Sequence, residues 1–201
     1  SDDFSAQINA FKSANTDIIT GVLIPPDFTT FWNQLRQQGI TPKAVTVAAA
    51  LLFPGSVEAM GPLGNGMTSE VWWTPAFPFK SSITGQTGQQ LADQWETEQK
   101  RQWTQPLGYS HAVMEIALDV LKRSNDPLDR EANREALAAT DLQTVVGRIN
   151  FTGQPHKNIC TTPIFGGQWV KGEKWPYDLK IVDNTVNQLF PPEQKIVALT
   201  W

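Results

Sequence analysis

A continuous apolar run, DIITGVLI at Asp17–Ile24, follows a segment whose apolar residues recur at helical spacing. In that preceding segment, Phe4, Ile8 and Phe11 predict a helix over Ser5–Ala14 with one buried face. An uninterrupted apolar run of this length is typical of a strand in a parallel sheet, where both faces are covered. The run therefore predicts a strand that is buried on both sides.

Strand and helix continue to alternate through the first third of the chain. Pro25–Pro26 ends the first strand, and the apolar residues of the next helix recur at i, i+3, i+4 and i+7: Phe28, Phe31, Trp32 and Leu35. Two more strands are expected in KAVTVAAA at Lys43–Ala50 and in EVWWT at Glu70–Thr74. Strands joined through helices by short links form parallel sheets with right-handed crossovers. The sequence thus predicts an α/β fold with Rossmann-like parallel sheets and flanking helices.

The rest of the chain has a different rhythm. The proline-rich stretch PAFPF, residues 75–79, suits a passage between two lobes. Helices are expected over Thr87–Trp103, Gly108–Arg123 and Arg130–Thr140, and strands in residues 143–151, 161–172 and 178–184. The second of these helices has a predicted buried stripe of five residues: Val113, Ile116, Ala117, Val120 and Leu121.

Composition narrows the class of protein. The 201 residues carry a net charge of −4 with scattered basic residues, which gives no sign of a nucleic-acid partner. A single cysteine, Cys160, has no partner for an internal disulfide. No apolar run is long enough to span a bilayer, and no signal peptide is visible. The chain is then either cytosolic or seen after processing or truncation.

Motifs for catalysis and metal binding are weak. GxSxG, HExxH, Walker and CxxC patterns are absent from the sequence. His111 and Glu115 lie four apart on a helix, and His156 and Cys160 are also four apart, but two ligands are too few for a metal site. No cofactor and no metal are expected.

Geometry offers a better lead. Ligands of open parallel α/β sheets bind beyond the carboxyl ends of the strands. Those ends are expected at Ile24–Pro25, Ala48–Ala49 and Thr74–Phe77, and none of these positions carries a carboxylate, a lysine or an arginine. The edge predicts an uncharged, partly aromatic binding surface, although packing alone explains each residue equally well.

Three stretches in this order resemble one family. They are DFSAQINAFKSANTDIITGVLIPPDFTTFWNQLRQQGI from Asp3, GYSHAVMEIALDVLKRS from Gly108 and FGGQWVKG from Phe165. Together they are similar to type I periplasmic solute-binding proteins of the branched-chain amino-acid ABC transporter group, over nearly the whole chain. The resemblance implies two Rossmann-like lobes with a ligand enclosed between them, and an incomplete version of that fold in this shorter chain.

The same resemblance implies a division of the chain. Residues 1–77 would form most of lobe two, residues 78–164 the C-terminal elements of lobe one, and residues 165–201 a return strand to lobe two and a tail. The missing N-terminal half is then expected as a separate piece, or its place is taken in a homo-oligomer, because apolar faces are left uncovered.

The resemblance also indicates ligand-binding positions. An aromatic residue of the family falls where this sequence has Ile24 and Pro25, and an acid that pairs with the ligand's ammonium falls at Ala48 or Ala49. A tyrosine of the family falls at His111, with Tyr109 close by. Trp73 and Phe77 complete the predicted site, although strand alternation sends Trp72 and Trp73 to opposite faces and core packing is the commoner role.

The expected function is therefore ligand capture without chemistry. Without an acid at Ala48 or Ala49, an enclosed ammonium lacks compensation for its desolvation, which favours a hydrophobic or aromatic carboxylate over an α-amino acid. The partner would be an ABC permease and the location periplasmic or extracytoplasmic. Two alternatives stay open: a ligand-sensing regulatory domain of the same fold, and a hydrolytic enzyme that uses Asp27 or Glu70 with His111.

Overall fold

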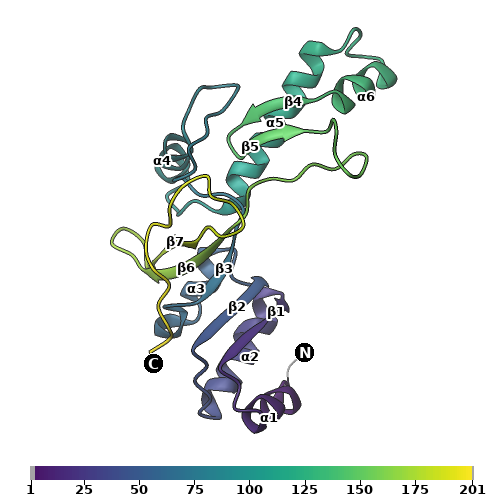
Figure 1. Cartoon of the computed structure of the whole chain (residues 1–201). Helices are drawn as coiled ribbons and strands as arrows, with labels where there is room; N and C mark the ends of the chain where they lie inside the picture. The colour runs from purple at the N-terminus through teal and green to yellow at the C-terminus, as the bar shows by residue number, and fades with distance from the viewer. Residues whose placement is uncertain (1–2, 201) are drawn as a thin grey trace. The chain divides into compact units, whose positions relative to one another are not determined.

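The computed structural model describes residues 3–200, which form two compact units (Figure 1). Of the described residues, the first unit comprises 3–71 and 165–200, and the second comprises 72–164. The sequence assigned Trp72–Phe77 to the same lobe as the strand before them, whereas in the structure they belong to the second unit. The assignment of the two units to lobes of a larger protein stays a prediction.

The first unit is built on a five-stranded sheet in the order β1-β2-β3-β6-β7 (Figure 1). The strands are β1 (Ile18–Leu23), β2 (Ala44–Ala49), β3 (Thr68–Val71), β6 (Phe165–Lys171) and β7 (Tyr177–Asp183). The pairs β1–β2 and β2–β3 are parallel, as predicted, while β3–β6 and β6–β7 are antiparallel. Helices α1 (Ser5–Ser13), α2 (Pro25–Gln37) and α3 (Pro54–Glu58) and the 3₁₀ turn η1 (Gly61–Gly64) complete the unit.

Aromatic side chains hold α1 and α2 together. Phe31 of α2 makes edge-to-face contacts with Phe4 and Phe11, at 5.6 and 6.2 Å between ring centroids, and Phe28 stacks on Trp32 at 5.9 Å. Such pairs contribute about 0.5–1.5 kcal/mol each beyond the area that they bury. The helical spacing read from the sequence therefore marks a real packing face.

The prediction that β1 is buried on both faces is wrong. Ile18 and Val22 are 63% and 75% exposed, and Ile19 alone in the strand is buried. Among the described residues β1 pairs only with β2, so it is an edge strand and one of its faces is uncovered. The apolar composition predicted the strand correctly, but it did not predict which elements lie beside the strand.

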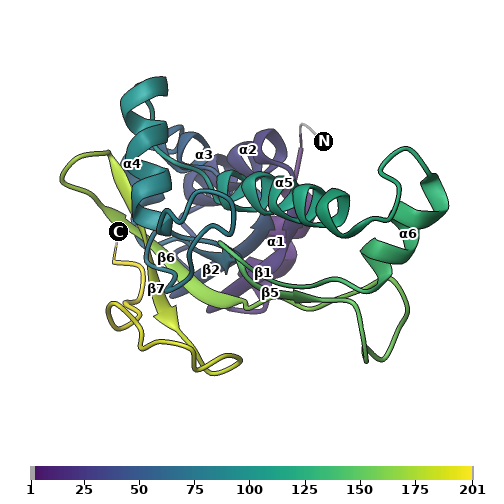
Figure 2. The same cartoon turned by 90° about the horizontal axis from the view of Figure 1, so that it is seen from above.

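The second unit contains three helices and a hairpin. The helices are α4 (Gly88–Gln99), α5 (Gln105–Arg123) and α6 (Arg130–Ala138), and the hairpin β4 (Asp141–Thr144) and β5 (Gly147–Asn150) lies beside α5 (Figure 2). The sequence predicted one strand where this hairpin stands. Gly147, with φ +115°, permits the reversal, and the Thr144 hydroxyl donates a 2.7 Å hydrogen bond to the Gly147 carbonyl oxygen.

The predicted buried stripe of α5 is also largely wrong. Val120 is buried, but Val113 and Leu121 are 61% and 45% exposed, Ala117 is exposed and Ile116 is half-buried. The buried positions of the helix are smaller or polar: Gln105, Gly108, Ala112, Glu115 and Val120. The inward face of α5 is determined by close packing against a neighbouring segment and by hydrogen bonds, and not by the hydrophobicity of its side chains.

Candidate ligand-binding site

The tips of β1 and β2 lie side by side at one edge of the first unit. Their parallel register pairs Val22 with Ala48 and Leu23 with Ala49, so the following Ile24 is next to the end of β2. Ile24 is exposed, while Ala48 and Ala49 are half-buried. The structure thus brings together the first four predicted site residues, which include Pro25.

The start of α2 makes this edge poor in hydrogen-bond donors. Pro25 and Pro26 occupy the first two positions of the helix, where other residues present free N–H groups. The Phe28 N–H is already used by the Ile24 carbonyl oxygen at 3.0 Å. The usual attraction of anions to a helix N-terminus is reduced there, and the surface is mainly apolar.

The end of β2 holds a strained backbone at Ala49. Its φ is +65°, a left-handed value that non-glycine residues rarely adopt, and the Ala50 N–H bonds to the Ala48 carbonyl oxygen at 2.8 Å across it. A hydrogen bond between residues i and i+2 around a positive φ is the rare form of the γ-turn. Strain of this kind costs about 1–3 kcal/mol and clusters at functional sites.

Trp73 and Phe77 do not share this edge, because β3 ends at Val71. Both belong to the second unit, and both are buried. The Trp73 indole N–H donates to the Val145 carbonyl oxygen at 3.2 Å, and its ring meets Trp103 edge-on at 5.8 Å. Phe77 packs edge-on against Phe79 at 5.9 Å. These two side chains have almost no surface left for a ligand in this structure.

Tyr109 lies near the start of α5 and faces the chain that leads out of the hairpin. Its hydroxyl is 2.6 Å from the Thr162 hydroxyl, and its ring meets Trp72 edge-on at 5.9 Å. Partial burial raises the pKa of Tyr109 above its ordinary value, against the opposing effect of the Thr162 hydrogen bond. The phenol is therefore held neutral, as a hydrogen-bonding group.

His111 lies on a different side of α5, because residues two apart on a helix do not face each other. Its Nε2 is 2.7 Å from the Ser81 hydroxyl, which also accepts hydrogen bonds from the backbone N–H groups of Ile83 and Thr84. With the Ser81 oxygen used as an acceptor twice, its proton is directed at Nε2. His111 is then the acceptor, with its own proton on Nδ1.

A small cavity of about 250 Å³ adjoins His111 within the second unit. It is lined by a mixture of amide, hydroxyl and apolar groups: Thr84, Gln86, Leu91, Gln94, Trp95, Glu98, Leu107 and His111. Of the predicted residues, His111 is the one that this cavity contains, so the structure does not bring Tyr109 and His111 to one surface.

Glu115, one turn after His111, is a buried carboxylate that the sequence suggested only as half of a metal pair. It is 1% exposed and accepts three hydrogen bonds: from the Ser82 N–H at 2.5 Å, the Ser82 hydroxyl at 2.8 Å and the Val145 N–H at 3.0 Å. Its oxygens are thus occupied by donors, and residues 3–200 contain no group of three or more His, Cys, Asp or Glu placed to hold a metal. The signal in the sequence was an acid placed between the apolar residues Met114 and Ile116 of the helix.

Ser81, His111 and Glu115 do not form a catalytic triad. Such a triad needs the acid to orient the histidine through its second nitrogen. Glu115 instead binds Ser82 and Val145, and Ser81 is 4% exposed. The pair of contacts, Ser81 to His111 and Ser82 to Glu115, anchors the loop that precedes α4.

A sequence model of the family described as periplasmic binding protein matches residues 1–174. The chain belongs to this family. A comparison with the curated proteins found no match.

Solved structures of this family share the fold. A leucine-binding protein from Thermotoga maritima superposes with a TM-score of 0.74 at 19% identity, over 92% of this chain and 50% of that one. An ABC-transporter solute-binding protein from R. palustris in complex with benzoate gives 0.65 at 14% identity, over 89% and 46%. A branched-chain amino-acid binding protein from Streptococcus pneumoniae in complex with isoleucine gives 0.66 at 12%, over 91% and 49%. The chain therefore spans about half the length of the structures it matches.

The resemblance seen in the sequence and the α/β type I periplasmic binding protein fold are thus confirmed, the fold in part of its length. Within residues 3–200, no helix has both the length and the apolar character that crossing a membrane requires. The family and the solved structures that the chain matches are solute-binding proteins.

Proposed function

We propose that the protein is the extracytoplasmic solute-binding component of an ABC transporter. Its ligand is a small amino-acid-like molecule or a hydrophobic or aromatic carboxylate, held between the two lobes. Family membership over residues 1–174 supports binding as the activity. Two of the similar solved structures contain isoleucine and benzoate, which represent the same two chemical classes.

One observation carries the choice between those classes. The paired tips of β1 and β2 offer Ile24, Pro25, Ala48 and Ala49, which have no charged group. Burying an ammonium against such a surface leaves its charge uncompensated, at a cost of several kcal/mol. The carboxylates with apolar or aromatic bodies are therefore the favoured ligands.

Each unit carries some of the predicted ligand positions. The first unit has those at the β1–β2 tip, and the second has Tyr109 and His111, two polar groups on different sides of α5. Ligand that binds the closed form of the protein more tightly shifts the population toward that form. An ABC permease would receive the closed form.

A thermal-shift screen tests the proposal. Ligand that binds only folded protein raises its melting temperature. We expect benzoate and short branched carboxylates to raise it more than leucine or isoleucine. Larger shifts with the zwitterionic amino acids would contradict the assignment of an uncharged tip, and no shift with any of the three classes would contradict the function.

The sensing alternative has the same ligand chemistry and differs only in the partner. A regulatory domain would bind a signalling protein in its ligand-bound form, and a transport component would stimulate ATP hydrolysis by its permease complex.

α5 exposes an apolar face at Val113, Met114, Leu118 and Leu121, and exposed apolar patches of this kind favour association. We expect the 201-residue chain alone to associate through it, and light scattering that finds a stable monomer would contradict this.

A further inference from the structure

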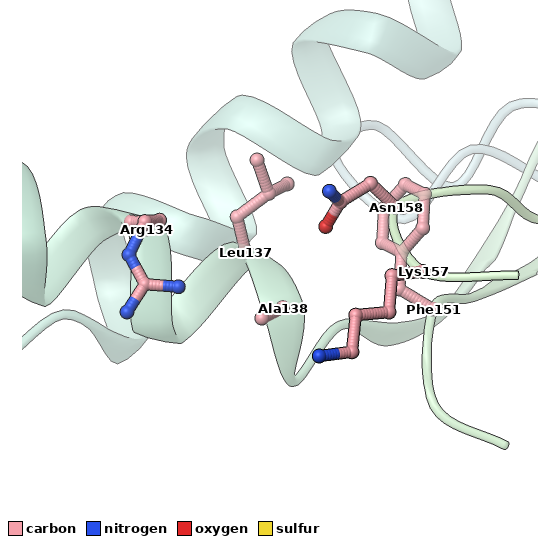
Figure 3. Close-up of a pocket in the computed structure, with 6 residues that line it drawn as sticks. All are labelled: Arg134, Leu137, Ala138, Phe151, Lys157 and Asn158. Atoms are coloured by element: carbon pink, nitrogen blue, oxygen red, sulfur yellow. The ribbon is translucent and has the colours of Figure 1, made fainter.

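The second unit contains a cavity of about 490 Å³ between the last turns of α6 and the loop that follows β5 (Figure 3). Its lining combines apolar and cationic groups: Arg134, Leu137, Ala138, Phe151, Lys157 and Asn158. We propose that this cavity binds an amphiphilic organic anion, a carboxylate on a hydrocarbon body. The site is additional to the ligand site proposed above.

The floor of the cavity suits a hydrocarbon body. Leu137 and Ala138 come from α6 and Phe151 from the end of the hairpin, and Leu137 is 42% exposed. The volume lies within the roughly 300–1,000 Å³ that is typical of small-molecule pockets. Covering these three side chains with hydrocarbon removes apolar surface from water, which stabilises the complex.

The polar groups of the cavity suit a carboxylate. Within residues 3–200, the side chains of Lys157 and Asn158 make no hydrogen bond or ion pair, and Figure 3 shows the Lys157 side chain extended toward α6. Arg134 uses Nε and Nη2 for Glu131, which leaves its Nη1 hydrogens for a ligand. No acidic residue lines the cavity, and Lys157 supplies a positive charge beside Arg134, which is ion-paired with Glu131 outside the lining.

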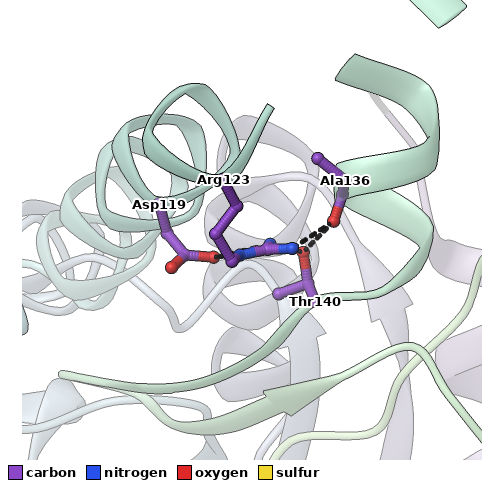
Figure 4. Close-up of polar contacts among 4 residues, drawn as sticks. All are labelled: Asp119, Arg123, Ala136 and Thr140. Atoms are coloured by element: carbon purple, nitrogen blue, oxygen red, sulfur yellow. Dashed lines mark hydrogen bonds and ion pairs between the residues drawn. The ribbon is translucent and has the colours of Figure 1, made fainter. Parts of the chain in front are cut away.

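Both walls are fixed in place. On one side Arg123 of α5 donates to the Ala136 carbonyl oxygen at 2.7 Å and to the Thr140 hydroxyl at 3.0 Å, and so holds the end of α6 (Figure 4). On the other side the Gln154 amide donates to the Asn150 carbonyl oxygen at 2.8 Å. Asn158 has φ +63°, a backbone conformation that asparagine tolerates better than most residues. A wall that is already ordered costs less entropy on binding.

The cavity is remote from the polar groups of the proposed ligand site in the same unit. Arg123, which contacts α6, is the last residue of α5, and Tyr109 lies 14 residues earlier. At about 1.5 Å per residue these positions are roughly 21 Å apart along the helix. A ligand of the cavity therefore does not touch Tyr109 or His111.

Octanoate is the probe, and each of two control compounds keeps one of its two parts, the hydrocarbon chain or the charged head. Octyl glucoside has a neutral head and a hydrocarbon chain that is one carbon longer, and acetate has the head without the chain. By isothermal titration calorimetry we expect octanoate to bind at least about tenfold more tightly than either, because both the charged hydrogen bonds and the apolar floor contribute. Equal binding of octyl glucoside, or no binding of octanoate, would overturn the proposal.

Substitutions locate the bound octanoate. Lys157→Gln together with Arg134→Gln should weaken it about tenfold or more, whereas Lys122→Gln together with Lys195→Gln, which removes two charges at exposed positions outside the cavity, should leave it unchanged. Amide chemical shifts of the intact protein should move at Leu137, Phe151 and Asn158. Octanoate that is lost in His111→Ala but kept in the double variant would lie in the ligand site and would overturn the second site. If octanoate does not bind the cavity, the outcome of the thermal-shift screen with benzoate is unaffected. The proposed function is then still tested separately.

Discussion

Gly108 of α5 lies directly against the indole ring of Trp73. A Cβ atom built on Gly108 would be 2.5 Å from Cε2 of that ring and nearer still to Cγ and Cδ2. The absence of a side chain at one position thus lets the helix approach a fully buried tryptophan. Both residues are buried within the second unit.

Gly108→Ala should destabilise the protein by about 1–2 kcal/mol. Alanine in a helix interior gains up to about 1 kcal/mol over glycine, but overpacking a core costs typically 1–3 kcal/mol, and a rigid ring leaves little room to adjust. The free energy of unfolding, from urea denaturation, measures the effect. Ser110→Ala, on the exposed side of the same helix, is the control and should be close to neutral. A Gly108→Ala variant as stable as the parent would show that Trp73 is free to move.

Replacement of Glu115 by glutamine should cost about 2 kcal/mol. The amide oxygen can keep the Ser82 contacts, but the amide nitrogen then faces the Val145 N–H, so two donors oppose each other in a buried place. A buried polar group left unsatisfied costs about 1–3 kcal/mol. Glu135→Gln, at an exposed position of α6, should change stability by a few tenths of a kcal/mol at most. Equal stabilities of the two variants would argue against the contact between Glu115 and the Val145 N–H.

These two contacts also show where reading the sequence fails. The order of strands and helices, the helical face of α2 and the family were all recognisable from periodicity and motif order, because each is a local property. The inward face of α5 was not, because it depends on Trp73 and on the Ser81–Ser82 loop, which are far away in sequence. Hydrophobicity alone placed Val113 and Leu121 inside, where the structure has Gly108 and Glu115.

The predictions for the candidate site also differ in this respect, because some depend on a local pattern and others on distant partners. Adjacent tips of β1 and β2 follow from the βαβ pattern, so Ile24, Pro25, Ala48 and Ala49 were found together. Trp73 and Phe77 were assigned to a third tip because β3 was expected to run to Thr74, but the chain leaves the sheet after Val71. The length of a strand depends on its partner, which the sequence does not display.

Ala49→Gly should stabilise the protein by about 1 kcal/mol. Glycine adopts φ +65° without the clash that alanine meets, and the γ-turn hydrogen bond is unaffected. The matched control is Ala48→Gly, one residue earlier in the extended part of β2, which should destabilise by about 0.5–1 kcal/mol because glycine loses more freedom on folding. Thermal and urea unfolding compare the two, and opposite signs are the expected result.

Stability should fall at alkaline pH through Tyr109. Burial raises the pKa of this phenol, so the folded state keeps its proton at a pH where the unfolded chain has lost it. The contribution is complete below the unfolded pKa, near 10, and is lost as pH rises through the folded pKa. Tyr109→Phe should therefore flatten the decline of unfolding free energy above about pH 10. The absorbance of tyrosinate reports the titration directly, and a Tyr109 that titrates at the ordinary pH would contradict it. Burial also raises the pKa of Tyr177, so Tyr177→Phe is the comparison that separates the two.

His111→Ala should weaken binding of the ligand identified by the thermal-shift screen and leave stability nearly unchanged. The imidazole is half-buried, it accepts one hydrogen bond from Ser81, and it adjoins a cavity of about 250 Å³. Removing it leaves the Ser81 hydroxyl with its two backbone partners, at a cost of about 1 kcal/mol or less. Loss of one hydrogen bond to a charged ligand corresponds to roughly tenfold or more in affinity.

His111→Gln keeps a side-chain acceptor for Ser81 and should fold like the parent, so calorimetry on both variants separates loss of the loop contact from loss of the ligand. Unaltered affinity in His111→Ala would remove this residue from the site and leave Tyr109 as the polar group of α5 that serves the ligand.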